Sequence, residues 1–264
     1  MSETRARISV ITVVRNEERN IRRMLDSVKW ADEIVAVDQS SQDRTVEICR
    51  GYTDKVFVVE PKGFCEPDRE YAASRASGEW ILYLDADEVV GEGLRQEIEG
   101  LLSGNAKHDC YWVPRRNFFL GKWIRGSGWW PGPVLRLFRK GRVRFPQQIH
   151  GQTTALSSNG VLKNALDHYT CETIDEYFAK VSRYTGILAK EQHGRGARIT
   201  PANSLFRFFF LPLGRAGQRY FLQAGFRDGV HGLLIAWFTF LTVSLMQYKT
   251  WELQRRTEHA DGSA

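Results

Sequence analysis

Several common classes of functional site are missing from this sequence. Its 264 residues include four cysteines, none in a CxxC pair, which argues against a zinc site or a disulfide framework. No glycine-rich turn follows the first predicted strand, as a nicotinamide-binding enzyme requires, and no P-loop motif occurs. The N-terminus lacks a signal-peptide pattern, so we expect the catalytic region to stay in the cytoplasm with reduced thiols.

The composition is that of a folded, moderately basic protein. Hydrophobic residues make up 42% of the chain and charged residues 26%, which is enough apolar material to build a core. The formal net charge is +6, and much of the positive excess lies late in the chain. Such a charge suits a nucleotide, an anionic membrane or nucleic acid, and charge alone does not choose among them.

The stretch WILYLDADE, residues 80–88, has five large apolar residues followed by three carboxylates. The apolar run predicts a strand buried on both faces of a parallel sheet, and ligands bind at the carboxyl edge of such sheets. In an extended chain Asp85 and Asp87 point the same way, with the small Ala86 between them. These oxygen ligands suit Mg²⁺ or Mn²⁺ bound with a substrate diphosphate. Alternatively, the acids cap a helix that begins near Glu88.

Strands and helices alternate through the first 104 residues. Apolar, β-branched runs predict strands at residues 8–14, 33–37, 55–59 and 80–84, and amphipathic helical patterns separate and follow them. This alternation predicts an α/β fold with a doubly wound, mostly parallel sheet. Polar clusters at residues 15–17, 38 and 85–88 should therefore meet at one edge.

The next part of the chain has a different pattern. Short strands are predicted at residues 110–114, 134–138 and 142–145, with a loop rich in Gly and Trp at 126–133. A helix is predicted at 173–191, with a capping box at its start. We expect one domain of residues 1–192, with a nucleotide half up to about 104 and a second half from about 105 that would wall the site.

From residue 193 to 264 the sequence is rich in Arg, Phe and Leu. Residues 229–248 carry no formal charge, and about 20 apolar residues suffice to span a membrane. The stretch also contains polar residues, however, and positive residues flank both of its ends, so no orientation follows. We expect helices that lie in or dip into the membrane interface, with arginines on anionic head groups. The alternative is a buried helix or an oligomer interface.

Four stretches together resemble family 2 glycosyltransferases with the GT-A fold: residues 10–17, 37–45, 84–88 and 135–139. The chain is most similar to bacterial enzymes of the lipopolysaccharide core glucosyltransferase type. The resemblance implies inverting, metal-assisted transfer of a hexose from a nucleotide-diphosphate donor, UDP favoured, to a lipid-linked acceptor such as lipopolysaccharide core or polyprenyl phosphate. It also implies the cytoplasmic face of a bacterial inner membrane and no nucleic-acid partner, and a homo-oligomer is compatible with it.

The resemblance assigns roles to individual residues. The nucleotide sugar would be bound by Arg15, Asn16, Glu17, Asp38, Arg69, Asp85 and Ala86. The divalent metal would be held by Asp85, Asp87 and His150, and the acceptor by Trp129, Trp130 and Arg136. For some of these residues a structural role is the alternative: helix capping for Asn16, a surface charge for Arg69 and core packing for His150.

The chain departs from the family where a general base is expected. Gly132 and Gly151 stand where relatives usually carry acids, and transfer to a sugar hydroxyl needs a base within hydrogen-bond reach. Glu88 or His150 could replace them as the catalytic residue. Otherwise the acceptor is an already ionised phosphate, or the protein is a non-catalytic scaffold docked on a membrane. A nucleotidyltransferase is the nearest enzyme alternative.

Overall fold

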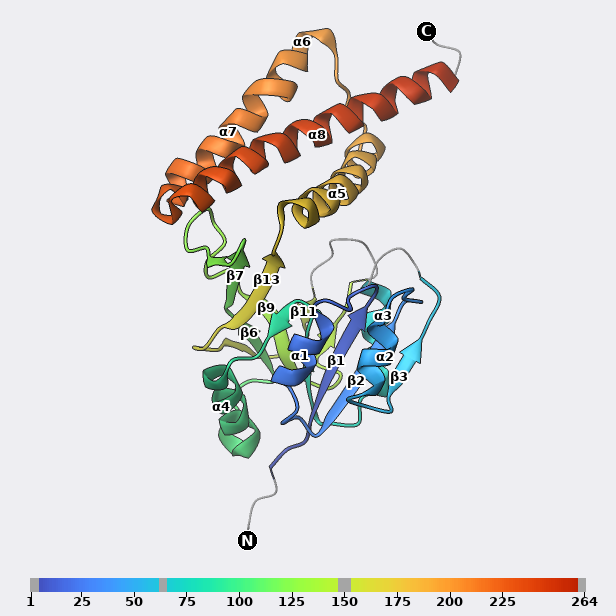
Figure 1. Cartoon of the computed structure of the whole chain (residues 1–264), viewed down its shortest axis with the longest axis vertical. Helices are drawn as coiled ribbons and strands as arrows, with labels where there is room; N and C mark the ends of the chain where they lie inside the picture. The colour runs from blue at the N-terminus through green and yellow to red at the C-terminus, as the bar shows by residue number, and fades with distance from the viewer. Residues whose placement is uncertain (1–4, 62–65, 147–152, 261–264) are drawn as a thin grey trace. The chain divides into compact units, whose positions relative to one another are not determined.

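The computed structural model describes residues 5–61, 66–146 and 153–260 (Figure 1). The chain divides into two compact units: residues up to Arg116 with Gly132–His168, and Asn117–Pro131 with the residues from Tyr169 onward. The second unit thus includes residues 117–131 and 169–192, which the sequence prediction assigned to the catalytic domain.

The first unit is built on a seven-stranded sheet with the order β12-β6-β9-β4-β1-β2-β3. Its strands are β1 (Ile8–Val14), β2 (Glu33–Asp38), β3 (Val56–Val58), β4 (Trp80–Tyr83), β6 (Cys110–Val113), β9 (Val134–Arg139) and β12 (Asn159–Val161). Strands β3, β2, β1 and β4 run parallel, β9 is antiparallel to both β4 and β6, and β12 is parallel to β6. The predicted α/β class with a mostly parallel sheet is confirmed.

Helices cover both faces of this sheet, as the doubly wound pattern predicted (Figure 1). Side chains of β1 alternate between two cores: Val10 and Val14 pack with α1 (Ile21–Ser27), α2 (Thr45–Arg50) and α4 (Glu92–Gly100), whereas Ile11 and Val13 pack with α3 (Glu66–Arg75). Because β1 is buried on both faces, its β-branched run has no polar face. In the parallel register Val14 lies beside Asp38, so the loops after β1 and β2 leave the same edge.

The helix predicted near Glu88 begins later than expected. Glu88 lies in β5 (Glu88–Val89), which pairs antiparallel with β13 (Leu166–Cys171), and α4 begins at Glu92 after the N-cap residue Gly91. The acids of residues 85–88 therefore do not cap this helix. A π-helical turn, Leu101–Asn105, follows α4, and a two-stranded pair is formed by β10 (Val143–Arg144) and β11 (Thr154–Ala155).

The second unit is mainly helical. It contains α5 (Ile174–Gly194), α6 (Pro201–Leu205), α7 (Leu211–Gly217) and α8 (Val230–Ala260), with π-helical turns at Phe206–Phe210 and Gln218–Leu222 and a 3₁₀ turn at Gly225–Asp228. Both α5 and α7 pack against α8. The short strand β8 (Lys122–Trp123) pairs with the end of β7 (Arg115–Phe119). Thr173 caps α5 by accepting the Glu176 N–H at 3.1 Å, as predicted.

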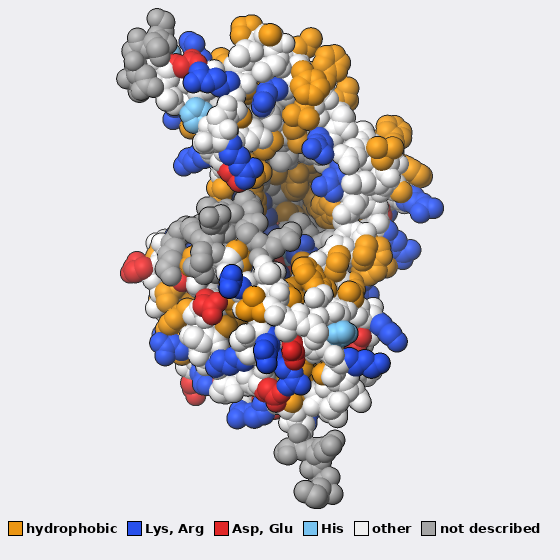
Figure 2. Space-filling view, turned by 180° about the vertical axis from the view of Figure 1, so that it is seen from behind, with side chains coloured by type: hydrophobic (Ala, Val, Ile, Leu, Met, Phe, Trp, Pro, Cys, Tyr) orange, Lys and Arg blue, Asp and Glu red, His pale blue; other side chains and the backbone are white. Residues whose placement is uncertain are grey.

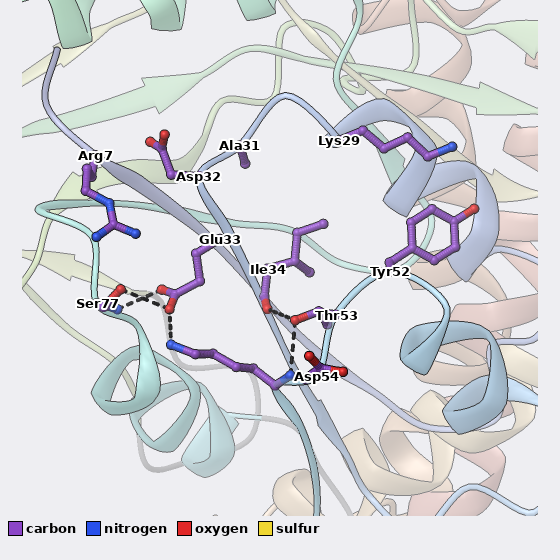
Figure 3. Close-up of a pocket in the computed structure, with 11 residues that line it drawn as sticks. Arg7, Lys29, Ala31, Asp32, Glu33, Ile34, Tyr52, Thr53, Asp54 and Ser77 are labelled. Carbon is purple, nitrogen blue, oxygen red and sulfur yellow. Dashed lines mark hydrogen bonds and ion pairs between the residues drawn. The ribbon is translucent and has the colours of Figure 1, made fainter.

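The Glu33 carboxylate connects four segments of the chain by hydrogen bonds at the amino edge of the main sheet. Glu33 accepts hydrogen bonds from the Ser9 hydroxyl and from the Lys55 ammonium. It also accepts from both the backbone N–H and the hydroxyl of Ser77 (Figure 3). Burial alone would raise the pKa of Glu33, but these donors outweigh it and lower the pKa to about 2. The residue lines a cavity of about 470 Å³ at the edge opposite the polar loops.

We expect the hydrogen bonds accepted by Glu33 to make the free energy of unfolding depend on pH. Since the Glu33 pKa is lowered from 4.5 to about 2, its contribution is present above pH 4.5 and is lost as the pH falls toward 2. When the pH falls from 5 to 2, the free energy of unfolding should decrease less in Glu33→Gln than in the wild type. The two decreases should differ by up to about 3 kcal/mol. Urea unfolding at both pH values measures this difference. The exposed Glu60→Gln is the control, and equal losses in Glu33→Gln and wild type would contradict the prediction.

The turn before α8 is closely packed. A Cβ on Gly232 would stand 1.8 Å from the carbonyl oxygen of Gly225, so no side chain fits between these two backbones. Asp228 is buried beside them and accepts the backbone N–H groups of Arg125 at 3.1 Å and Gly126 at 2.7 Å. The loop before Trp129 is thereby fixed to this turn.

Gly232→Ala should destabilise the second unit by about 1 to 3 kcal/mol or more, because the backbone must shift to admit the methyl group. Gly214→Ala is the matched control, since a Cβ there meets nothing within 4 Å and alanine favours a helix over glycine by about 0.5 to 1 kcal/mol. Thermal unfolding of both variants tests the prediction. It fails if the midpoint of Gly232→Ala matches or exceeds that of the wild type.

Candidate active site

The loops after β1 and β2 are hydrogen-bonded to each other. The Asn16 N–H donates to the Ser41 hydroxyl at 2.8 Å, and the Asn16 side-chain oxygen accepts the Gln42 N–H at 2.8 Å. The Glu17 N–H donates to the Thr45 hydroxyl at 2.8 Å. Asn16 has a left-handed backbone (φ +54°) and α1 begins only at Ile21, so the alternative that Asn16 caps this helix is wrong.

The predicted donor-binding residues of these loops lie at the carboxyl edge of the sheet. Asp38, the last residue of β2, is fully buried and accepts the N–H and the hydroxyl of Ser41 at 2.7 and 2.5 Å. Arg15 is exposed, and Glu17 is half-buried and accepts the Asn20 amide at 2.9 Å. The sheet order places β1 between β2 and β4, where doubly wound folds bind ligands.

The acidic stretch after β4 is a turn. Strand β4 ends at Tyr83, and the Glu88 N–H donates to the Asp85 carbonyl at 3.1 Å. The predicted extended chain across Asp85–Asp87 is therefore wrong, and strand alternation does not align the two carboxylates. Asp85 accepts from the Tyr83 hydroxyl and from Arg136, whereas Asp87 lies beside His168. The methyl group of Ala86 packs in the core.

A buried arginine joins two of the acids. Arg136 lies on β9, the strand antiparallel to β4, and donates to Asp85 and, at 2.8 Å, to Glu88. Glu88 is fully buried; its other oxygen accepts the Asp85 N–H at 3.0 Å, and Arg115 lies 3.4 Å away. The side chains predicted as acceptor ligand (Arg136) and catalytic residue (Glu88) are thus both engaged inside the protein.

Two guanidinium groups flank the ring of Tyr83, Arg69 at 4.7 Å and Arg136 at 4.5 Å from the ring centre. Burial would raise the pKa of Asp85, but the positive charges of Arg136 and Arg69 outweigh it and lower the pKa. Burial and the Asp85 charge raise the pKa of Tyr83, so its phenol stays protonated and donates to Asp85. The site therefore holds an ionised carboxylate near neutral pH. Arg69 belongs to it and is more than a surface charge.

The sequence prediction did not select His168. Its Nε2 lies 3.4 Å from the Asp87 carboxylate, because the register of β13 with β5 places His168 opposite Glu88. The segment Asp167-His168-Tyr169 also resembles the family at these positions, but the resemblance implies no role for it. Asp167 accepts a hydrogen bond from Arg116 at 2.6 Å.

The remaining predicted positions are His150, Gly151, Trp129 and Trp130. His150 and Gly151 are outside the described residues. Trp129 and Trp130 belong to the second unit, where Trp129 packs edge-on against Phe119 with ring centres 5.9 Å apart. Trp130 contacts Trp123 and is 37% exposed, so it has the more accessible ring of the two.

The acidic side chains suit a divalent ion only together with a substrate. Within residues 5–61, 66–146 and 153–260, no group of three or more His, Cys, Asp or Glu side chains could hold a metal by itself. Mg²⁺ typically takes one or two carboxylates and completes its shell with water and phosphate oxygens. Asp87 would supply such a carboxylate, whereas both oxygens of Asp85 already accept from Tyr83 and Arg136.

Comparisons with known proteins give a consistent result. The family model for glycosyl transferase family 2 matches residues 9–164. The lipopolysaccharide core biosynthesis glycosyltransferase LpsC of Rhizobium meliloti is 27% identical over 235 residues, 84% of this chain and 82% of the relative. An uncharacterized glycosyltransferase of Rickettsia bellii is 27% identical over 97% of this chain and 91% of its own.

Two solved structures share the fold at 16% identity. S. aureus TarS 1–349 in complex with UDP-GlcNAc has a TM-score of 0.51 and covers 95% of this chain and 92% of its own. The mannosyltransferase PcManGT from Pyrobaculum calidifontis, in complex with GDP-Man and Mn²⁺, has a TM-score of 0.50 and covers 94% and 86%. Both are GT-A glycosyltransferases. The chain therefore belongs to glycosyl transferase family 2 and is an enzyme with the GT-A fold.

Proposed function

We propose that this enzyme transfers a hexose from a nucleotide-diphosphate donor, UDP favoured, to a lipid-linked acceptor, with inversion at the sugar carbon. The arrangement that carries the proposal is the ionised Asp85 held between Tyr83, Arg69 and Arg136, beside the joined loops after β1 and β2. Lipopolysaccharide core is the favoured acceptor, because the LpsC relative has that role in its name. Polyprenyl phosphate is the alternative acceptor.

The donor would lie along the carboxyl edge of the sheet. Asp38 and the loop of Arg15, Asn16 and Glu17 would hold the base and ribose, and Arg69 would face the phosphates. A sugar leaves only when charge that develops on the departing diphosphate is stabilised. Arg69 is suited to this because it already lies beside the ionised Asp85.

Asp87 is the stronger candidate for direct metal binding. The oxygens of Asp85 are engaged by Tyr83 and Arg136, whereas Asp87 is 18% exposed and lies beside His168. A divalent ion bound there would supply Lewis-acid stabilisation of the diphosphate. We assign His168 to orienting the Asp87 carboxylate, because outer partners of this kind commonly fix metal ligands.

Glu88 is better suited to positioning than to proton transfer. Its side chain is fully buried and contacts Arg136, Arg115 and the backbone of Asp85. A base for a sugar hydroxyl must reach the acceptor. If Glu88 is not the base, two alternatives follow. Either the acceptor is a phosphate, which needs no base, or His150 supplies the base.

A membrane-docked scaffold is the second candidate function. It is favoured by Gly132, which stands where relatives usually carry an acid, and by the burial of Glu88. The nucleotidyltransferase alternative has no support from the comparisons, since the matched family and both structural neighbours are glycosyltransferases. For the transferase we propose the cytoplasmic face of a bacterial inner membrane, where a lipid-linked acceptor is available.

Titration calorimetry with UDP, GDP and ADP, with and without Mn²⁺, tests the transferase proposal. We expect one nucleotide to bind in a Mn²⁺-dependent way, and Asp87→Ala to weaken that binding at least tenfold because a metal ligand is lost. The control is Asp54→Ala, which removes an exposed acid at the amino edge of the sheet. If folded wild-type protein binds none of the three nucleotides, the transferase proposal fails and the scaffold is favoured.

Glu88→Gln separates positioning from base catalysis. If Glu88 positions Arg136, the substitution should lower the free energy of unfolding by about 2 to 3 kcal/mol, because a buried charge loses part of its compensation. Affinity for the nucleotide with Mn²⁺ should fall as well. Urea unfolding and calorimetry measure both, with the exposed Glu92→Gln as control. Wild-type stability and affinity in Glu88→Gln would contradict the positioning role.

A further inference from the structure

We propose that the second unit docks in the plane of an anionic lipid bilayer, through one face of the hairpin formed by residues 201–222 and α8, without crossing the bilayer. This inference deepens the proposed function, since it names the surface that would meet a lipid-linked acceptor. Its test requires no sugar transfer and no nucleotide, so its failure is distinguishable from failure of the transferase proposal.

The first arm of the hairpin exposes large apolar side chains at helical spacing. Side chains on one face of a helix recur every three or four residues. The exposed members are Leu205, Phe206, Phe209, Phe210 and Leu213, each at least 48% accessible. A water-soluble surface rarely gathers so many large apolar groups on one helix face. Figure 2 shows hydrophobic side chains clustered over the helices of this unit.

Ring contacts connect this face to α8. Phe210 and Phe209 have ring centres 5.5 Å apart, and Phe209 meets Phe240 of α8 at 6.3 Å. Phe240 in turn stacks on Trp237 at 5.5 Å, with the two ring planes only 10° apart. Since Trp237 is 55% exposed, the two helices present one continuous aromatic surface. We call this surface the aromatic face.

The turn of the hairpin extends the exposed apolar surface. Phe221 and Leu222 are 69% and 84% exposed at the end of the first arm, and Val230 is 70% exposed at the start of α8. Between them, Phe226 is 52% exposed and packs near Tyr220. Phenylalanine and leucine gain free energy when such side chains enter the acyl boundary of a bilayer.

The charge of the residues around the aromatic face indicates which partner binds it. Between residues 193 and 251 the only acid is Asp228, which is 3% exposed. The same stretch has seven basic residues. Arg207, Arg219 and Lys249 donate hydrogen bonds within the second unit, and four are exposed: Arg195, Arg198, Arg215 and Arg227. A second copy of this surface would bring like charges together, whereas anionic head groups attract basic residues that lie near the bilayer surface. An anionic bilayer is therefore the partner that fits.

The packing of α8 opposes a membrane-spanning arrangement. Among the described residues, the one helix long and apolar enough to cross a membrane is Val230–His259. However, α5 packs along α8 on one side, where the Tyr177 ring stacks on Phe238 with ring centres 4.7 Å apart. Polar contacts accompany this packing: Tyr177 with Thr242 at 3.2 Å, and the Lys249 ammonium with the Ser182 carbonyl at 2.7 Å. The opposite face of α5 is charged, with Arg183 and Lys190 exposed. Hydrocarbon on all sides of α8 would bury these charges, at a cost of several kcal/mol each.

The candidate acceptor loop is attached to the same hairpin. Asp228 binds the backbone of Arg125 and Gly126, and Arg219 donates to the Ser127 carbonyl. The loop that carries Trp130 is therefore built on the turn of the hairpin. Docking of the aromatic face would hold this loop at the bilayer surface, where the sugar of a lipid-linked acceptor is found.

Flotation of the full-length protein with lipid vesicles tests the proposal. We expect binding to phosphatidylcholine vesicles that contain phosphatidylglycerol, and at least tenfold weaker binding to vesicles of phosphatidylcholine alone. The double variant Phe221→Ser/Leu222→Ser should bind the anionic vesicles at least tenfold more weakly. The matched control, Leu156→Ser/Val161→Ser, removes two exposed apolar side chains of the first unit and should bind as the wild type does.

Two further measurements separate in-plane docking from its alternatives. Alkaline carbonate should release the bound wild type from vesicles, because no helix crosses the bilayer; a carbonate-resistant protein would overturn the proposal in favour of a span. Light scattering without lipid should give the same mass for wild type and double variant. A wild-type dimer that the variant dissociates, or equal vesicle binding by both proteins, would also overturn it.

Discussion

The burial of one arginine between two acids is the constraint on which the site depends. Arg136 is 6% exposed and pairs with Asp85 and Glu88, so its charge is compensated inside the protein. A buried pair contributes little net stability, but removing one partner is costly. The network therefore serves mainly to hold groups in position. It connects β9 to the turn after β4, and it keeps Asp85 ionised beside the edge where the polar loops meet.

This network also explains why Asp85 and Asp87 have different side-chain partners. A strand end alone would have presented Asp85 and Asp87 side by side, but the turn directs Asp85 toward Arg136 and Asp87 toward His168. One carboxylate is then fixed by the charge of Arg136, and the other lies beside His168, where we propose that a metal ion binds. The backbone N–H of Asp85, held by Glu88, fixes the turn that separates them.

The fold was predictable because its signals are local. The β-branched run of β1 and the apolar run of β4 are each buried on both faces, and such strands need no information from distant residues. The site was predictable only in part. The family resemblance named Asp38 and Arg69 as site residues, and their roles stay predictions. The engagement of Arg136 with Glu88 and the approach of His168 to Asp87 depend on the registers of β9 and β13. Those pairings join residues far apart in sequence, and no periodicity encodes them.

The same distinction applies to the C-terminal region. Composition alone leaves a 20-residue uncharged stretch ambiguous, because spanning, interfacial and buried helices share it. Packing favours the interfacial arrangement that we propose: α5 covers one side of α8 with both ring and polar contacts, while Trp237 and Phe209 leave another side apolar and exposed. A helix that makes hydrogen bonds to a neighbouring helix on one face and exposes aromatic side chains on the other is suited to a boundary between water and lipid. If the donor binds at the sheet and the acceptor at the loop built on the turn before α8, as we propose, the enzyme would draw one substrate from water and the other from the bilayer.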